Sequence, residues 1–192
     1  MDLRPFALPV ALATLAAIVL LPLRSEAATA TPPAPPPRLP IVPGGAILSR
    51  FGPRSIRGVA KQHNGIDLSA PRGTPVRSPL DGTVVAVYPD GEVSGYGNLV
   101  TVRHGDIGLL YAHLDAITVR AGDAVAAGQQ VGTIGSTDST EGGFSSSGAH
   151  LHLEVIVPTP GQVDTGLTHF TGSTPPRVDP EPWADAQGVR LV

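Results

Sequence analysis

Two histidines stand two positions apart in the segment GAHLHLEV, at His150 and His152. On a β-strand successive side chains point to opposite faces, so both imidazoles share a face with Glu154 while Leu151 and Leu153 share the other. We expect the aliphatic face to enter the core and the imidazoles to project from the exposed face, where Thr, Lys and Glu are more usual. An H-x-H pair does not define a metal site by itself, because the fragment is common by chance.

A second polar segment, QHNGIDL, brings another histidine close to a carboxylate. His63 precedes Asn64-Gly65, a turn signal, and Asp67 then alternates with Ile66 and Leu68. The pattern predicts a loop that runs into a strand, with Asp67 on the face opposite the aliphatic residues and able to meet His63 across the bend. The alternative is a carboxylate that hydrogen-bonds its own turn.

Together the two segments could hold a metal ion. The chain has no cysteine, so any metal must be bound by His, Asp or Glu. A catalytic zinc takes three N or O ligands, leaves a fourth position for water and lowers the pKa of that water toward neutrality. His63, Asp67 and His152 would supply such a set. His150, offset along its strand by about 6–7 Å, and His113 would stand beside the metal and serve in proton transfer and oxyanion stabilisation.

Three further residues near these segments each allow two interpretations. Glu154 continues the histidine face, and it either orients a ligand histidine through a hydrogen bond or is a solvated strand residue. Tyr111 is two positions before His113 and would share its face on a strand, either lining the site or filling the core. His104, at the junction of a strand and a turn, is interpreted as a structural or exposed residue.

Short strands and many turns must position these residues. The segment GTPVRSPLDGTVVAVYPDG predicts two strands around the Asp81-Gly82 turn, and GNLVTVRHGDIGLLYAHL predicts two more joined at HGD. Further short apolar pieces follow in VRAGDAVAAGQQVGTIG, and HLHLEVIV is the last clear strand. No amphipathic helix of convincing length is evident. The predicted fold is therefore all-β, a compact antiparallel sheet that is closed or sandwiched, over roughly 115 residues at positions 44–160.

The N-terminal segments have a different composition. Residues 1–30 combine an early arginine, an apolar run and small residues, which predicts a signal peptide cleaved after Ala27 or Ala30. The alternative is an uncleaved membrane anchor. Either way we expect the rest of the chain to be exported to the periplasm, cell envelope or medium, with no membrane contact after cleavage. Residues 31–43 are a proline-rich linker, semi-rigid and extended.

The C-terminal residues 161–192 are rich in Pro, Gly and Thr. We expect this extension to pack on the domain through Trp183, with a short helical turn starting at Pro180 in DPEPW. Nothing in the extension suggests chemistry. The net charge of −3 and the absence of a basic block argue against nucleic acid as a partner.

The histidine segments also resemble a known family. HNGID, YAHL at 111–114 and GAHLHLEV, with the flanking GYGNLVTVRHG and VRAGDAVAAGQQVGTIGST, together are similar to the lysostaphin and LytM family of zinc metallopeptidases, family M23. The resemblance runs from about residue 50 to residue 157. It implies a compact all-β domain with a groove, of the duplicated-hybrid-motif type, that cuts peptide bonds in bacterial peptidoglycan.

Carried over residue by residue, the resemblance implies one zinc ion per chain. Its ligands would be His63, Asp67 and His152, and the non-ligand catalytic histidines would be His113 and His150. The segment GSTDSTEGGFSSSGAH is longer than the usual link of the family, so we expect a flexible loop there that alters the groove.

Two other function classes compete with a zinc endopeptidase. Some LytM-like domains have lost ligands and activate other wall hydrolases without catalysis, but all five site positions are intact here. A lipoyl- or biotinyl-type carrier is suggested by the glycine spacing of VRAGDAVAAGQQVG, but the only lysine, Lys61, is far from that segment. Peptidoglycan is the expected partner, together with a regulatory or targeting protein, since no wall-binding helper domain is visible.

Overall fold

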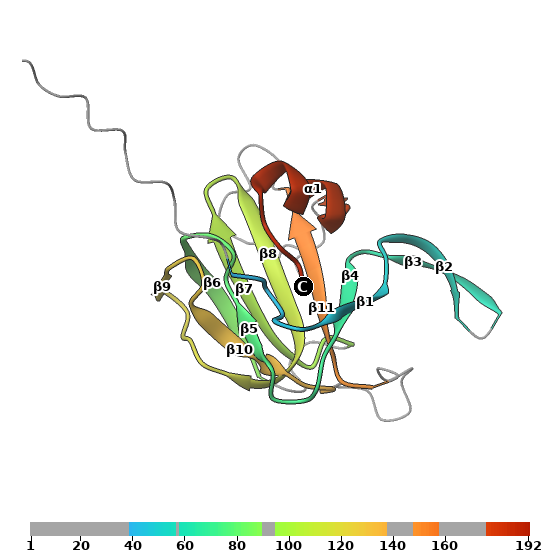
Figure 1. The fold of residues 1–192 in the computed structure, drawn as a ribbon, viewed down its shortest axis with the longest axis horizontal. Helices are drawn as coiled ribbons and strands as arrows, with labels where there is room; N and C mark the ends of the chain where they lie inside the picture. The colour runs from blue at the N-terminus through green and yellow to red at the C-terminus, as the bar shows by residue number, and fades with distance from the viewer. Residues whose placement is uncertain (1–38, 57, 90–94, 138–147, 158–175) are drawn as a thin grey trace, which may run out of the picture. The chain divides into compact units, whose positions relative to one another are not determined.

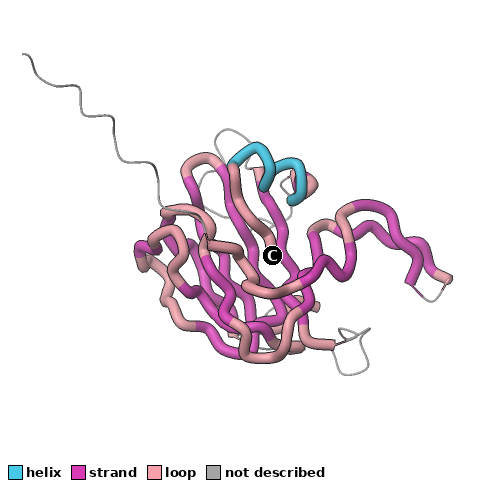
Figure 2. Tube along the Cα trace, viewed as in Figure 1, coloured by secondary structure: helices cyan, strands magenta, loops and turns pink. Residues whose placement is uncertain are grey.

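The computed structural model describes residues 39–56, 58–89, 95–137, 148–157 and 176–192. These residues belong to one compact unit, which spans residues 36–192, and they form twelve strands and one helix (Figures 1 and 2). The predicted signal peptide, most of the proline-rich linker and residues 138–147 of the predicted loop lie outside the described residues. Within the described ranges no helix has the length and apolar character needed to span a membrane.

One antiparallel sheet contains most of the strands. Across it lie β1 (Ala46–Ser49), β4 (Ile66–Ser69), β11 (His150–Ile156), β8 (Ile107–Ile117), β7 (Asn98–His104), β6 (Gly82–Tyr88) and β9 (Ala124–Val125). The prediction of an all-β antiparallel fold is thus confirmed. As far as the chain is described, this path begins at β1 and ends at β9, so the sheet does not close into a barrel.

Shorter strands extend this sheet. β10 (Gln130–Ile134) pairs with β5 (Pro75–Arg77) and with the second half of β8, and β12 (Arg177–Val178) pairs with β11. A separate hairpin, β2 (Gly52–Ile56) with β3 (Val59–His63), extends away from the sheet in Figure 1. His63 is the last residue of β3, so the prediction of a loop at this position is wrong.

The core forms where the aliphatic faces of the strands meet. Leu151, Leu153 and Val155 of β11 pack with Leu109 and Tyr111 of β8, and all five are fully buried. Each such side chain contributes about 1.5–3 kcal/mol on burial. Tyr111 is therefore a core residue. The opposite face of β11 is covered as well, since all seven residues of the strand are buried, and the prediction that its histidines lie on an exposed face is wrong.

The single helix in the described part of the chain, α1 (Pro180–Gln187), begins where DPEPW predicts a turn. Asp179 caps it by accepting a hydrogen bond from the Glu181 N–H at 3.0 Å, Pro180 fits the first turn, and Gly188 ends it in the left-handed conformation. Trp183 packs against the core. Helix α1 therefore fixes the segment on either side of it, including the neighbouring strand β12.

Candidate metal centre

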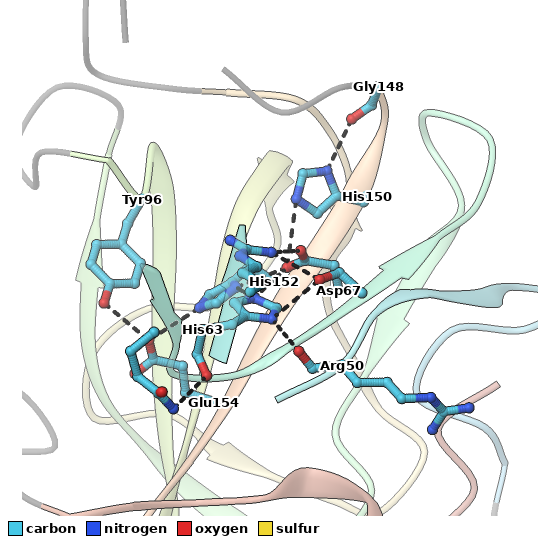
Figure 3. A network of polar contacts seen from close by, with 11 residues as sticks. Arg50, His63, Asp67, Tyr96, Gly148, His150, His152 and Glu154 are labelled. Atoms are coloured by element: carbon cyan, nitrogen blue, oxygen red, sulfur yellow. Dashed lines mark hydrogen bonds and ion pairs between the residues drawn. The ribbon is translucent and has the colours of Figure 1, made fainter. Parts of the chain in front are cut away.

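Three side chains from three strands converge on one point. Asp67 of β4 and His152 of β11 stand opposite each other in register, and His63 ends β3 just before the turn into β4. His63 Nε2 lies 3.1 Å from Asp67 Oδ1 and 3.1 Å from His152 Nδ1, and the last two atoms are 2.9 Å apart. All three side chains are buried, and Figure 3 shows how they lie toward one another. The structure thus brings the three predicted ligands together.

The outward nitrogens of both histidines are hydrogen-bonded to acceptors. His63 Nδ1 donates to the carbonyl oxygen of Arg50 at 2.7 Å, and His152 Nε2 donates to Glu154 Oε1 at 3.1 Å. Because these partners can only accept, each outward nitrogen carries a proton. The inward nitrogens, Nε2 of His63 and Nδ1 of His152, face Asp67 Oδ1, and each is the atom of its ring that could give a lone pair to a metal ion. Such outer hydrogen bonds are what fixes a metal-binding histidine in position.

Asp67 is held in a similar way. Its Oδ1 faces the two histidines, while Oδ2 accepts a hydrogen bond from Arg54 Nη1 at 3.0 Å. Burial by itself would raise the pKa of Asp67, but its hydrogen bonds with His152 and His63 hold that pKa well below its usual range. Asp67 is therefore a carboxylate at any ordinary pH.

Three acceptor atoms about 3 Å apart repel one another unless a positive charge lies among them. Burial opposes a charge on His152, yet hydrogen bonds with Asp67 and Glu154 outweigh it and raise the pKa of His152 to about 9. The cluster thus favours a cation. A tetrahedral zinc with bonds of about 2.0–2.1 Å places its ligand atoms about 3.3–3.4 Å apart, close to the spacing found here. Two nitrogens and one carboxylate oxygen fit zinc in number, kind and spacing.

Gly65 lets the turn between β3 and β4 lie against β11. A Cβ at this position would stand 2.3 Å from the carbonyl oxygen of Leu153 and 3.0 Å from Cε1 of His152. Any side chain would push the turn away from the strand that carries His152. The Asn64-Gly65 turn therefore sets the distance between His63 and the other two donors.

His150 and His113 stand beside the cluster. His150 Nδ1 donates to the Gly148 carbonyl oxygen at 3.0 Å, and its Nε2 lies 3.8 Å from Asp67 Oδ1, beyond hydrogen-bond distance. His113 Nδ1 donates to the Thr137 carbonyl oxygen at 2.9 Å. The two ring centroids are 4.9 Å apart. In each ring Nδ1 therefore carries a proton, and Nε2 is the nitrogen that these backbone hydrogen bonds leave available. Burial lowers the pKa of His113 to about 4, so this imidazole is neutral at pH 7.

A β-bulge brings His113 to this side of the sheet. Its φ is 61°, the only positive value at a non-glycine residue in the described part of the chain. β8 pairs with β11 as far as Ala112 and with β10 from Leu114. At the same place β8 contains one residue more than its other partner, β7, which is a β-bulge. The bulge breaks the alternation, so His113 and Tyr111 do not share a face and that prediction is wrong. The left-handed conformation costs about 1–2 kcal/mol.

The structure adds residues that sequence reasoning missed. Tyr96 donates its hydroxyl to Glu154 Oε1 at 3.0 Å, and Arg177 Nε donates to Glu154 Oε2 at 2.7 Å. Glu154 is fully buried, which excludes the interpretation as a solvated residue. Arg177 comes from the C-terminal extension, and through Glu154 it reaches the hydrogen-bond network of His152. Tyr96 lies in GYGNLVTVRHG, a segment of the family resemblance, but no periodicity or local motif links Tyr96 or Arg177 to Glu154.

His104 lies outside this cluster and is buried. Its Nδ1 donates to the Asp81 carbonyl oxygen at 2.9 Å, and its Nε2 has no hydrogen-bond partner among the described residues. Burial lowers the pKa of His104, because protonation would bury a second N–H without an acceptor. His104 is thus a structural residue, one of the two interpretations that the sequence left open.

The low pKa of His104 predicts a pH-dependent stability. The unfolded chain takes up this proton near pH 6.5 while the folded chain resists it, so the free energy of unfolding falls as the pH drops below about 6.5. In His104→Asn the amide can still donate to Asp81 but cannot titrate. We expect urea unfolding at pH 7 and pH 5 to show a smaller loss of stability in the variant. An equal loss in both proteins would contradict this assignment.

A buried cluster of two histidines and one carboxylate on an antiparallel sheet, flanked by two further histidines, is the kind of centre found in metal-dependent hydrolases. A model of the family described as Peptidase family M23 matches residues 61–164. The chain therefore belongs to peptidase family M23.

Known proteins of related sequence and structure agree with this family. Peptidoglycan DD-endopeptidase ShyA of Vibrio cholerae is 37% identical over 124 residues, which cover 62% of this chain and 27% of ShyA. The catalytic domain of the antimicrobial peptidase lysostaphin from Staphylococcus simulans superimposes with a TM-score of 0.55 at 26% identity, over 73% of this chain and 92% of that one.

A zinc containing peptidase from Vibrio cholerae is similar as well, with a TM-score of 0.52 and 33% identity over 62% of this chain and 35% of that chain. The first curated relatives are much longer proteins: the matched region spans only 17%, 34% and 24% of their lengths. The likeness therefore concerns one domain of these relatives.

Proposed function

We propose that this protein is an exported zinc metalloendopeptidase that hydrolyses peptide cross-links of bacterial peptidoglycan. The observation that carries the proposal is the convergence of His63 Nε2, Asp67 Oδ1 and His152 Nδ1 within about 3 Å of one another, with every outward atom held by a partner. Membership of family M23 and the similarity to a peptidoglycan DD-endopeptidase support the substrate class.

In this proposal His63, Asp67 and His152 hold one zinc ion per chain. Zinc would supply Lewis-acid chemistry, polarising a peptide carbonyl group and making water more acidic. His113 and His150 present Nε2 acceptors next to the ligands, with their rings fixed by backbone carbonyl groups. They are suited to take a proton from water, return it to the leaving amine and stabilise the oxyanion. The buried ligands keep these groups in a fixed arrangement.

The remaining predictions from the sequence are part of the same proposal. Residues 1–30 would direct export to the periplasm or cell envelope, residues 31–43 would act as a linker, and residues 44–160 would form the peptidase domain with 161–192 packed on it. Peptidoglycan would be the substrate, with a regulatory or targeting protein as a second partner. A non-catalytic activator of another wall hydrolase is the alternative, but such a module needs neither the three donors nor the two histidines beside them.

Removal of the metal tests the proposal. Dialysis against a strong chelator should reduce hydrolysis of cross-linked muropeptides to the level without protein, and one equivalent of Zn²⁺ should restore it. The physical reason is that the histidines alone supply no Lewis acid. The matched control is the chelator-treated protein given Mg²⁺, which prefers six oxygen ligands and should not restore activity. Full activity in protein shown to be metal-free would contradict the zinc assignment.

A further inference from the structure

A buried arginine in the C-terminal extension connects that segment to the metal centre. We propose that Arg177 is a positioning residue that acts through Glu154 to hold the ring of His152 with Nδ1 toward the metal. This inference rests on the proposed zinc site, because its effect is exerted on one of the three zinc ligands. It assigns a role to a strand that follows the peptidase domain in the chain.

The contacts form a continuous path from β12 to the cluster. β12 pairs with the end of β11, where Arg177 stands opposite Ile156, and the Arg177 side chain is only 4% exposed. Its Nε donates to Glu154 Oε2 at 2.7 Å. The other carboxylate oxygen, Oε1, accepts from His152 Nε2 at 3.1 Å. The guanidinium and the imidazole therefore hold opposite oxygens of one carboxylate.

Tyr96 completes the arrangement around Glu154. Its hydroxyl donates to Oε1 at 3.0 Å, so Oε1 accepts hydrogen bonds from Tyr96 and His152 and Oε2 accepts one from Arg177. The charge-assisted hydrogen bond from Arg177 to Oε2 and the hydrogen bond from Tyr96 to Oε1 together hold the plane of the Glu154 carboxylate. With that plane fixed, Oε1 stays in line with His152 Nε2–H, and rotation of the imidazole would break the hydrogen bond.

Loss of the guanidinium would leave a buried carboxylate without its cationic partner, which is costly in a low-dielectric interior. Glu154 would then turn toward another donor or toward water and release its hold on His152 Nε2. His152 would still be present in the sequence, but its Nδ1 would no longer be directed toward His63 and Asp67. Outer partners of this kind change metal affinity by about 10–100-fold in other metal sites.

Arg177 belongs to the C-terminal extension, residues 161–192, so this link to His152 starts outside the predicted peptidase domain. The family match ends at residue 164, so Arg177 lies outside it. Arg177 precedes Asp179, the N-cap of α1, and α1 is packed against the core through Ala184 and Trp183. The helix thereby keeps β12 beside β11. The ordered C-terminal segment thus becomes a condition for tight metal binding.

Zinc affinity tests this role independently of activity. The full chain is freed of metal, and its Kd for Zn²⁺ is measured by competition with a chromophoric chelator for the unchanged protein, Arg177→Met, Arg177→Lys and Glu154→Gln. We expect Arg177→Met and Glu154→Gln each to weaken binding about 10–100-fold, and Arg177→Lys to fall between them and the unchanged protein. Cobalt substitution should show an altered visible spectrum in Arg177→Met, which a merely structural role would not produce.

Arg77→Met is the matched control. Arg77 lies in β5 and donates to the Gly128 carbonyl oxygen, so its loss removes a partly buried arginine from the sheet without touching Glu154. We expect this variant to bind zinc as tightly as the unchanged protein.

A double variant keeps the test valid if Arg177→Met fails to fold. Glu154→Gln with Arg177→Met removes both buried charges, and it should bind zinc as Glu154→Gln alone does, because both residues act along one path. Unchanged zinc affinity in Arg177→Met would overturn the inference. So would a double variant whose fold-loss in zinc affinity equals the fold-losses of the two single variants multiplied together, because the two residues would then act independently. Absence of zinc binding in the unchanged protein would instead overturn the proposed function, and this inference with it.

Discussion

Replacing His152 with alanine is expected to abolish zinc binding and peptidoglycan hydrolysis together. His152 Nδ1 is one of three donor atoms, and it lies 2.9 Å from Asp67 Oδ1 and 3.1 Å from His63 Nε2. Two donors alone do not make a zinc site of the usual kind. Since loss of an outer partner already weakens metal sites about 10–100-fold, loss of the ligand itself should cost more.

Metal content after dialysis and release of muropeptides should be measured on the same His152→Ala preparation. His104→Asn is the matched control, because it replaces another buried histidine that lies outside the cluster and keeps its hydrogen bond to Asp81. We expect the control to retain zinc and activity. A His152→Ala protein that still hydrolyses peptidoglycan would refute the ligand assignment.

Replacing His113 should separate zinc binding from turnover. His113 is not one of the converging donors, and its Nδ1 is already engaged with the Thr137 carbonyl oxygen. His113→Ala should therefore keep one zinc per chain and lose turnover by about 10²–10⁴-fold, the usual contribution of a group that transfers a proton. KM should change much less than kcat, because the imidazole acts on the reacting atoms.

His113→Asn sharpens this test. Asparagine tolerates the left-handed conformation found at φ 61° and can donate to Thr137, but it has no atom in the place of Nε2. We expect this variant to unfold at the same urea concentration as the unchanged protein or a higher one, and to be as inactive as His113→Ala. Turnover within a factor of a few of the unchanged protein would rule out a role for His113 in proton transfer.

Local patterns in the sequence allowed many of the strands of the large sheet to be predicted and the candidate site residues to be named. Alternation in HLHLEVIV put His150, His152 and Glu154 on one face of β11, and the same rule placed Asp67 opposite Ile66 and Leu68. These predictions depend only on the period of two in a β-strand. The resemblance to family M23 then singled out which histidines would be ligands and which would not.

Features that depend on contacts between distant segments could not be predicted in this way. The bulge at His113 arises because β8 changes partner from β11 to β10, and nothing in YAHLD marks an extra residue. Arg54 and Arg177 reach Asp67 and Glu154 only after the hairpin and the C-terminal strand have packed. The burial of both faces of β11 has the same origin.

Digestion of isolated peptidoglycan tests the central claim most directly. The purified protein with one equivalent of Zn²⁺ is incubated with peptidoglycan sacculi, and the released muropeptides are identified by mass spectrometry beside His152→Ala. A zinc endopeptidase predicts new free amino groups at peptide cross-links, absent from the variant, and their position names the bond that is cut. Intact cross-links in the presence of fully zinc-loaded protein would contradict the proposal and favour the non-catalytic activator.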